Sequence, residues 1–230
     1  MRGDRHASPL FCTPNRVIAA FPALTLEADA AMLRISSATP LAVVSSAVVG
    51  AELPVAQDFL VLRVPRDYAG TAPDADLHVE AIRRGVDRPF VGFMTAASVA
   101  SPRLTFEAHS DIRVLAVATV GLGNLSAAGV SPPAPRSPGT INLLLFIDAR
   151  LSRSAMVGAV ITATEAKATV LAARGFRTSE GWPASGTSTD ALAIACTGRG
   201  STLEYAGPVT TVGWLIGRAV RRILQDPSLP

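Results

Sequence analysis

The stretch from 138 to 175 constrains the fold of this chain more than any other part of its sequence. Residues 143–147 read Leu-Leu-Leu-Phe-Ile, an apolar run of strand length that follows a Gly-Thr pair closely. Ser152 then opens a helical pattern that runs to Arg174 and closes at Gly175. The pattern predicts a central strand over Thr140 to Asp148 with a long helix packed on it.

Apolar and β-branched runs elsewhere predict further strands. The clearest lie at 41–49, 90–99, 103–108, 112–120 and 191–196. Short polar links between the three strands from 90 to 120 predict antiparallel hairpins. The long helix and a C-terminal helix near 210–224 flank the strands instead of alternating with them. We therefore predict an α+β fold, with packed β-sheets flanked by helices.

Composition favours one folded domain and narrows the kind of partner. Hydrophobic residues make up 49% of the chain and charged residues only 17%, so a substantial core can form. We expect a loose N-terminal segment at 1–16 and a single domain at 17–226. The net charge of +3 is spread along the chain, which argues against a nucleic-acid or membrane surface. A small-molecule partner is expected, and a homo-oligomer is left open.

The cysteines and histidines indicate no metal site. Cys12 and Cys196 form neither a disulfide framework nor a CxxC pair, and His6, His78 and His109 lack HExxH-type spacing. We therefore expect no bound metal and no cofactor, and a reduced, cytoplasmic setting fits the two cysteines. The sequence shows no apolar leader and no unbroken run of 18 apolar residues, so a soluble protein is expected.

Thr140 and Asn142 are the first candidates for chemistry. They stand at the mouth of the predicted central strand, where side chains two residues apart lie on the same face. A hydroxyl at such a place can act as a nucleophile. The alternative is that both side chains only finish a turn and satisfy loop carbonyls.

Two further polar clusters lie on either side of this strand in the sequence. Gly121 and Asn124 belong to a Gly-rich turn, where a backbone can approach a ligand closely and an Asn amide can stabilise an oxyanion. Glu165 and Lys167 are two residues apart on the long helix, so they point roughly 200° apart and one of them is expected to face a polar site. The alternative for Gly121 and Asn124 is an ordinary left-handed turn, which favours Gly and Asn. The alternative for Glu165 and Lys167 is that both side chains are simply solvated at the edges of the helix.

A last cluster, Thr187, Ser188, Thr189 and Asp190, precedes the strand 191–196. Hydroxyls and a carboxylate at a strand mouth can orient a nucleophile or bind a polar substrate, or they can simply cap and turn the chain. Because all these clusters flank apolar secondary structure and repeat the same Gly, Thr or Ser, and Asn or Asp chemistry, they indicate one shared site able to support acyl transfer.

At these residues the sequence resembles the adenosylcobinamide amidohydrolase family, CbiZ. The resemblance runs in order over roughly 41–222. Its segments are Gly92–Ala97 (family pattern G-x-MTAA), Thr119–Asn124 (TVGxxN), Gly139–Asn142 (GTIN), Thr162–Lys167 (TATEAK), Gly186–Asp190 (GTGTD), and a C-terminal block at Tyr205–Gly207 and Leu215–Val220. Several motifs in one order are far more specific than a single short pattern.

The resemblance implies a hydrolase that cleaves the aminopropanol amide of adenosylcobinamide and releases adenosylcobyric acid for corrinoid salvage. The corrinoid would then be the small-molecule partner. Three departures stand against it: Val209 and Trp214 replace a His and a Glu expected from the family, and 61–63 lacks an expected Asn. These departures leave open a catalytically silent corrinoid-binding protein.

A shorter stretch is similar to the self-processing aminopeptidases and ornithine acetyltransferases of the DmpA/ArgJ type. This second resemblance implies an αββα sandwich, and it allows a self-processed aminopeptidase or acyltransferase acting on a smaller amide. By this likeness Thr140 is the nucleophile, Asn124 the oxyanion donor, and Asp190 with its neighbouring hydroxyls the orienting group. The predicted catalytic residues are Thr140, Asn124, Asp190 and Glu165, and the predicted substrate-binding residues are Thr95, Gly121, Asn142, Lys167, Thr187, Ser188 and Thr189.

Overall fold

The computed structural model describes residues 16–17, 21, 23–133 and 139–229. The predicted loose segment at 1–16 therefore lies outside the described residues, apart from Arg16. Most described strands join one nine-stranded sheet, in the order β1-β2-β3-β12-β9-β7-β6, with β4 paired to β3 and β5 to β4. These strands are β1 (Arg16–Val17), β2 (Leu24–Ala28), β3 (Met32–Ser45), β4 (Val55–Arg63), β5 (Phe90–Thr95), β6 (Arg103–His109), β7 (Ile112–Val120), β9 (Ile141–Ile147) and β12 (Ala191–Cys196).

The sheet bends along β3. β3 pairs with β4 from Met32 to Ala42, and with β2 over its first part, whereas its last residues, Ala42 to Ser45, pair with β12. The register against β4 shifts between Ser36 and Leu41, and such an irregularity bends a strand and increases its twist. The sheet consequently has two halves, one built around β4 and β5 and the other around β12, β9 and β7.

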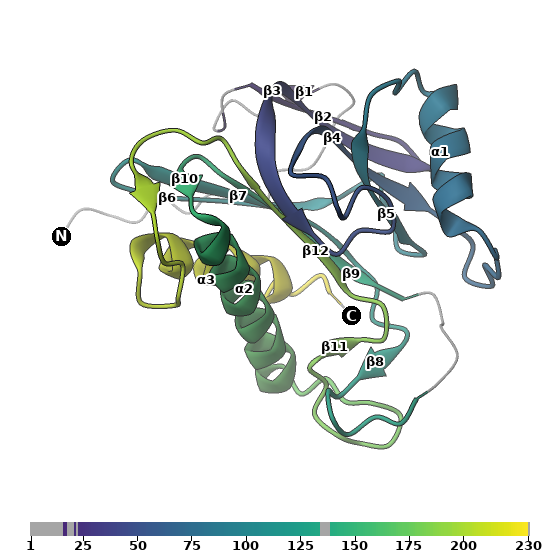
Figure 1. Ribbon diagram of the computed structural model, residues 1–230. Helices are drawn as coiled ribbons and strands as arrows, with labels where there is room; N and C mark the ends of the chain where they lie inside the picture. Colours follow the sequence, from purple (N-terminus) through teal and green to yellow (C-terminus); the bar gives the residue numbers. More distant parts are fainter. Residues whose placement is uncertain (1–15, 18–20, 22, 134–138, 230) are drawn as a thin grey trace.

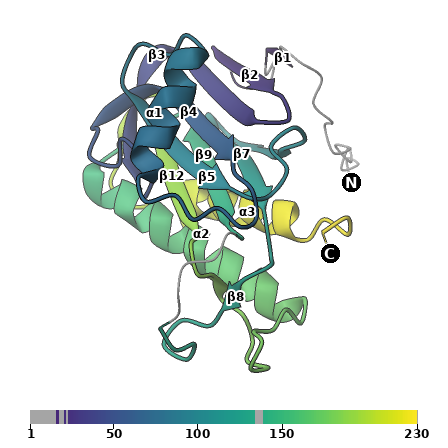
Figure 2. The same cartoon turned by 90° about the vertical axis from the view of Figure 1, so that its right-hand side faces the viewer.

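The two halves pack face to face. One core cluster takes side chains from both, including Phe59 of β4 and Phe146 of β9, whose rings meet edge to face with centroids 5.0 Å apart. Helix α1 (Pro73–Arg83) covers the outer side of β4 and β5, and α2 (Arg153–Ala173) and α3 (Thr211–Leu224) cover the outer side of β12, β9 and β7. Figures 1 and 2 show this α-β-β-α order of layers. The predicted α+β fold is confirmed.

Strand β9 is central, as the apolar run predicts. It lies between β12, to which it is parallel, and β7, to which it is antiparallel, and all seven of its residues are buried. Its odd-numbered residues, such as Leu143, pack with α2, and its even-numbered residues, such as Leu144, face the other half of the sheet. Ser152 caps α2 by accepting a hydrogen bond of 3.2 Å from the Ala155 amide.

One predicted hairpin is wrong. Strand β5 does not pair with β6; it pairs in parallel with β4, and β6 forms its hairpin with β7. The reason is the layering, because β5 lies in one half of the sheet and β6 at the edge of the other. The link at 96–102 therefore crosses between the halves instead of turning back on itself.

Helix α2 is long and apolar enough to cross a membrane by length and composition alone. The buried core helix of a soluble protein passes the same test, and α2 packs with the sheet and α3 in one core cluster.

Asp58 of β4 is a buried carboxylate that is expected to contribute to stability at neutral pH. Its Oδ1 accepts hydrogen bonds from Arg34 Nε at 2.9 Å and Ser36 Oγ at 2.7 Å, and its Oδ2 pairs with Arg88. Burial alone raises the pKa of Asp58, but the bonds from Arg88, Ser36 and Arg34 outweigh it and leave the pKa below its ordinary value.

Asp58→Asn should therefore lower the free energy of unfolding by about 3 kcal/mol at pH 7, because it removes one partner of a buried ion pair. Since the folded pKa is depressed, this contribution is present above the unfolded pKa of about 3.9 and is lost as the pH falls through the folded pKa. Urea denaturation of both proteins should show a gap at pH 7 that shrinks below pH 4. An equal gap at both pH values would contradict this account.

Candidate functional site

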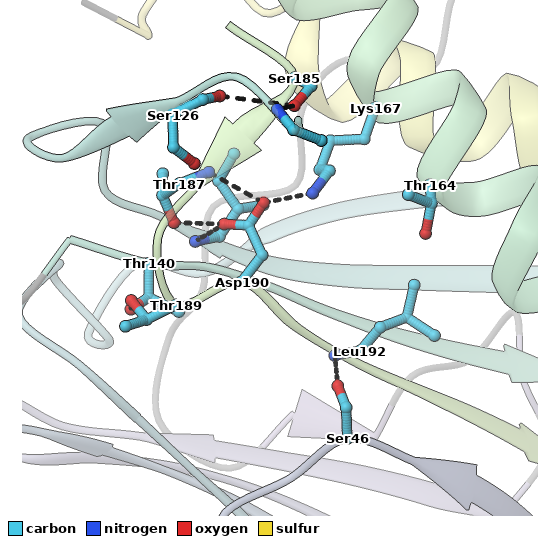
Figure 3. A network of polar contacts seen from close by, with 12 residues as sticks. Ser46, Ser126, Thr140, Thr164, Lys167, Ser185, Thr187, Thr189, Asp190 and Leu192 are labelled. Atoms are coloured by element: carbon cyan, nitrogen blue, oxygen red, sulfur yellow. Dashed lines mark hydrogen bonds and ion pairs between the residues drawn. The ribbon is translucent and has the colours of Figure 1, made fainter. Parts of the chain in front are cut away.

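The predicted polar clusters meet at the beginnings of β9 and β12. These neighbouring strands are parallel, with Ala191 aligned to Asn142, so the residues just before each strand lie side by side. Thr140 Oγ1 and Thr189 Oγ1 share a hydrogen bond of 2.6 Å, and the Ile141 amide donates to Asp190 Oδ1 at 3.1 Å. Figure 3 shows Thr140 and Thr189 close to Asp190.

Asp190 is the hub of this network. Its Oδ1 accepts from the Ile141 amide and the Thr187 hydroxyl, and its Oδ2 accepts from the Thr187 amide at 3.1 Å and from Lys167 Nζ. Lys167 reaches this carboxylate from α2 (Figure 3), and its side chain is only 11% exposed. Gly186 makes room for the pair, because a Cβ there would lie 2.7 Å from Lys167 Nζ. With four donors on two oxygens, Asp190 is suited to hold neighbouring groups in place.

A small two-stranded sheet joins the Gly-rich turn to this hub. β8 (Leu125–Ser126) pairs with β11 (Gly186–Thr187). Just beside it, Asn124 Nδ2 donates to Ser188 Oγ at 2.7 Å, and the Ser188 amide donates to the Asn124 carbonyl at 3.2 Å. The chain is also tight at Gly139, where a Cβ would lie 2.5 Å from Asn124 Oδ1. Asn124 therefore lies next to the Gly139–Thr140 peptide.

The hydroxyl protons in the network can be assigned by counting. Thr189 Oγ1 donates to the Gly139 carbonyl at 3.2 Å, and a threonine hydroxyl carries only one proton. The hydrogen bond between the two threonines is then donated by Thr140. Thr140 Oγ1 is therefore the donor in this bond and does not use its lone pairs in it. Thr140 is only 5% exposed.

Asn142 and Thr95 lie deeper, between the two halves of the sheet. Asn142 Nδ2 donates to the Met94 carbonyl and to Thr119 Oγ1, both at 3.2 Å, and its buried Oδ1 has no hydrogen-bond partner among the described residues. Thr95 Oγ1 accepts from the Ala97 amide at 3.1 Å. Gly121 lies close to Thr140, because its amide donates to the Thr140 carbonyl at 3.0 Å.

The structure does not bring Glu165 into the network. Glu165 is exposed, whereas Lys167, two residues later on α2, is buried against Asp190. Of the two, Lys167 is the residue that faces the polar site. Val209 and Trp214 lie away from this network as well: Val209 is 97% exposed, and Trp214 contacts Arg218 and His109.

A pocket of about 210 Å³ opens beside the hub, on the side of β9 and β12 that faces α2. Lys167 and Asp190 line it, but Thr140 and Asn124 do not, so the four predicted clusters form one network without lining this one pocket together. Its other lining residues are Ser46, Ile141, Leu143, Val160, Thr164, Ala191 and Leu192. The sequence gives no signal for Ser46 or Val160, because their place at the pocket depends on chain packing.

Cys196 is a buried free cysteine in the described part of the chain. Burial raises the pKa of the Cys196 thiol to about 12, so this cysteine stays protonated and unreactive at neutral pH. No group of three or more His, Cys, Asp or Glu side chains in the described ranges is arranged to hold a metal ion.

Comparison with known proteins places this arrangement in a family. Residues 21–226 match the family model described as adenosylcobinamide amidohydrolase, CbiZ. The adenosylcobinamide amidohydrolase of Methanosarcina mazei is 32% identical over 167 residues, which cover 69% of this chain and 76% of that protein. The protein of the same name from Halobacterium salinarum is 37% identical over 177 residues, covering 71% of this chain and 73% of that one.

Among solved structures, the PH0078 protein from Pyrococcus horikoshii OT3 is similar with a TM-score of 0.48 at 11% identity, covering 95% of this chain and 82% of that one. The family model spans nearly all of the described residues and includes every residue of the polar network. The chain belongs to the adenosylcobinamide amidohydrolase family.

Proposed function

We propose that this protein hydrolyses the aminopropanol amide of adenosylcobinamide and releases adenosylcobyric acid for cobamide synthesis. The observation that carries the proposal is the family match over residues 21–226. The polar network at the beginnings of β9 and β12 supports it, because amide hydrolysis needs a nucleophile and donors for a tetrahedral oxyanion. Release of aminopropanol from adenosylcobinamide is the test.

In this proposal Thr140 Oγ1 attacks the amide carbonyl carbon, and its proton is relayed through Thr189 Oγ1, with which it shares the 2.6 Å hydrogen bond, to the nitrogen of the leaving aminopropanol. Asn124 donates to the developing oxyanion. The C–N bond breaks, aminopropanol leaves with a proton, and water hydrolyses the resulting ester to give the carboxylate. Asp190 positions the reacting strand through the Ile141 amide, since four donors already occupy its oxygens.

One observation favours a self-processed form of the enzyme as a second candidate. Thr189 Oγ1 contacts both the Gly139 carbonyl oxygen, at 3.2 Å, and Thr140 Oγ1, at 2.6 Å. This arrangement polarises the Gly139 carbonyl beside a hydroxyl that can attack it. Attack would convert the Gly139–Thr140 amide to an ester, and water would then divide the chain. The freed amine of Thr140, with a pKa of roughly 7.7 to 8.0, would be a base suited to neutral pH.

Intact-mass measurement of the purified protein distinguishes the two forms. A single species near 23.8 kDa means that the peptide bond survives and that Thr140 acts within an unbroken chain. Two fragments that divide between Gly139 and Thr140 mean self-processing, and Thr140→Ala, which lacks the hydroxyl, should then remain whole. A screen of peptide amides against adenosylcobinamide would separate a smaller-amide enzyme from the corrinoid hydrolase.

A further inference from the structure

The pocket beside Lys167 has the chemistry of a subsite for part of a ligand. Its volume of about 210 Å³ lies below the 300–1,000 Å³ typical of complete small-molecule sites, but it exceeds the roughly 150 Å³ cavity that holds benzene. Ile141, Leu143, Val160 and Leu192 supply apolar walls. The pocket therefore suits a short apolar stem with a polar end and is too small for a macrocycle.

Lys167 supplies the donor for that polar end. An ammonium has three N–H groups, and one of them is used on Asp190 Oδ2. Among the described residues no other hydrogen-bond partner of Lys167 is found, although the residue is only 9% exposed. A carbonyl oxygen that enters the pocket can therefore accept a hydrogen bond from Nζ.

The charges around the pocket favour a neutral group. The carboxylate of Asp190 lines the same pocket and already balances the charge of Lys167, so a second carboxylate would be repelled by it. Thr164 Oγ1 also lines the pocket; it donates to the Val160 carbonyl at 2.8 Å and keeps oxygen lone pairs that can accept an N–H. An acceptor and a donor on one neutral head describe a primary carboxamide.

The pocket is adjacent to the proposed nucleophile along both strands. Ile141 lines it and directly follows Thr140, and Asp190 lines it and directly follows Thr189. In Figure 3, Thr140 and Thr189 lie to one side of Asp190, and Thr164, Leu192 and Ser46 lie to the other. Side chains alternate along a strand, so Thr140 and Thr189 point to the opposite face of the sheet from Ile141 and Asp190. A ligand that reaches around the beginnings of β9 and β12 can place its scissile amide at Thr140 and a neighbouring arm in the pocket.

We infer that this pocket receives a short carboxamide arm of the corrinoid substrate, with the carbonyl oxygen on Lys167 Nζ and the amide N–H on Thr164 Oγ1. The inference rests on the proposed function, because a corrinoid carries acetamide and propionamide arms around its ring. A free small carboxamide has the same chemistry, and the experiment below separates the two sources.

The test is the equilibrium dissociation constant of adenosylcobinamide, measured by dialysis and corrin absorption in Thr140→Ala protein, which is expected to bind the substrate without hydrolysing it; the two variants below are made in that protein. Val160→Phe fills the pocket from α2 and should weaken binding by about 10- to 200-fold, the range expected when a pocket loses a small group. Val157→Phe is the matched control, because Val157 lies one turn earlier on α2, is 48% exposed and does not line the pocket. It should leave the dissociation constant within about threefold.

Competition at the unaltered pocket, in protein that carries Thr140→Ala alone, provides a second measurement that does not depend on how a pocket variant folds. Propionamide should weaken adenosylcobinamide binding, and propionate at equal concentration should not. Equal effects of the two compounds would overturn the carboxamide assignment. Unchanged binding in Val160→Phe, or equal weakening in both variants, would overturn the inference. If propionamide binds but Val160→Phe keeps full corrinoid affinity, the site belongs to a free ligand and the inference fails.

If the proposed function fails, the product assay and the binding measurements give a different combination of results. Wild-type protein that binds adenosylcobinamide without releasing aminopropanol contradicts hydrolysis, while the comparison of dissociation constants still decides whether the arm enters the pocket.

Discussion

Thr140→Ala is expected to lower the turnover of adenosylcobinamide on the order of 10⁴-fold or more, while the dissociation constant changes by less than about threefold. Removing a nucleophile costs this much because its hydroxyl acts only in bond making. Thr140 is 5% exposed, and its hydroxyl bonds to Thr189, so its loss should leave the substrate's binding contacts in place. Single-turnover release of aminopropanol, measured beside equilibrium binding, separates the two quantities.

Thr140→Ser is the control for this experiment. Serine keeps a hydroxyl at the same position and should retain turnover within about 100-fold of wild type. If Thr140→Ala instead binds substrate weakly but turns over normally at saturation, Thr140 is a substrate contact. The nucleophile would then be sought in a water near Asp190.

Asp190→Asn is expected to lower the free energy of unfolding by about 3–5 kcal/mol and to remove most of the activity. The two side chains of the Lys167–Asp190 pair are only 11% and 16% exposed, and removing one partner leaves a charge buried without compensation. The new NH₂ group would also face N–H donors, because the carboxylate now accepts from the amides of Ile141 and Thr187. Urea denaturation at pH 7 measures the loss.

A double variant shows whether the uncompensated charge of Lys167 causes the loss of stability. Lys167→Met combined with Asp190→Asn removes that charge and should recover part of the lost stability, since a buried pair can often be replaced by apolar groups at little cost. Asp67→Asn, at an exposed position, should stay within about 0.5 kcal/mol of wild type. If the double variant were less stable than Asp190→Asn alone, the buried charge would not explain the effect.

The parts of the fold that depend on local sequence were predictable. The apolar run before Asp148 indicates a buried strand whatever its neighbours, and Ser152 with Gly175 marks the ends of the long helix. The pairing of β5 was not predictable from the short link that follows it. That link is equally consistent with a hairpin and with a crossing between two layers, and the bend in β3 decides between them.

The candidate site was likewise predictable only in part. Clusters before two strands come together once those strands are parallel neighbours, which the sequence suggests only through its repeated polar chemistry. Periodicity shows that Glu165 and Lys167 diverge, but not which of them faces the sheet. The pocket could not be predicted, because Ser46 reaches it through bonds with Leu192, distant in the sequence.

The measurement that tests the proposed function most directly is product analysis after wild-type protein is incubated with adenosylcobinamide in ¹⁸O-labelled water, with Thr140→Ala as the blank. Hydrolysis predicts equal amounts of free aminopropanol and adenosylcobyric acid, with one ¹⁸O atom in the new carboxylate and no product in the blank. Bound adenosylcobinamide recovered intact would contradict the proposal and identify a corrinoid-binding protein without hydrolytic activity.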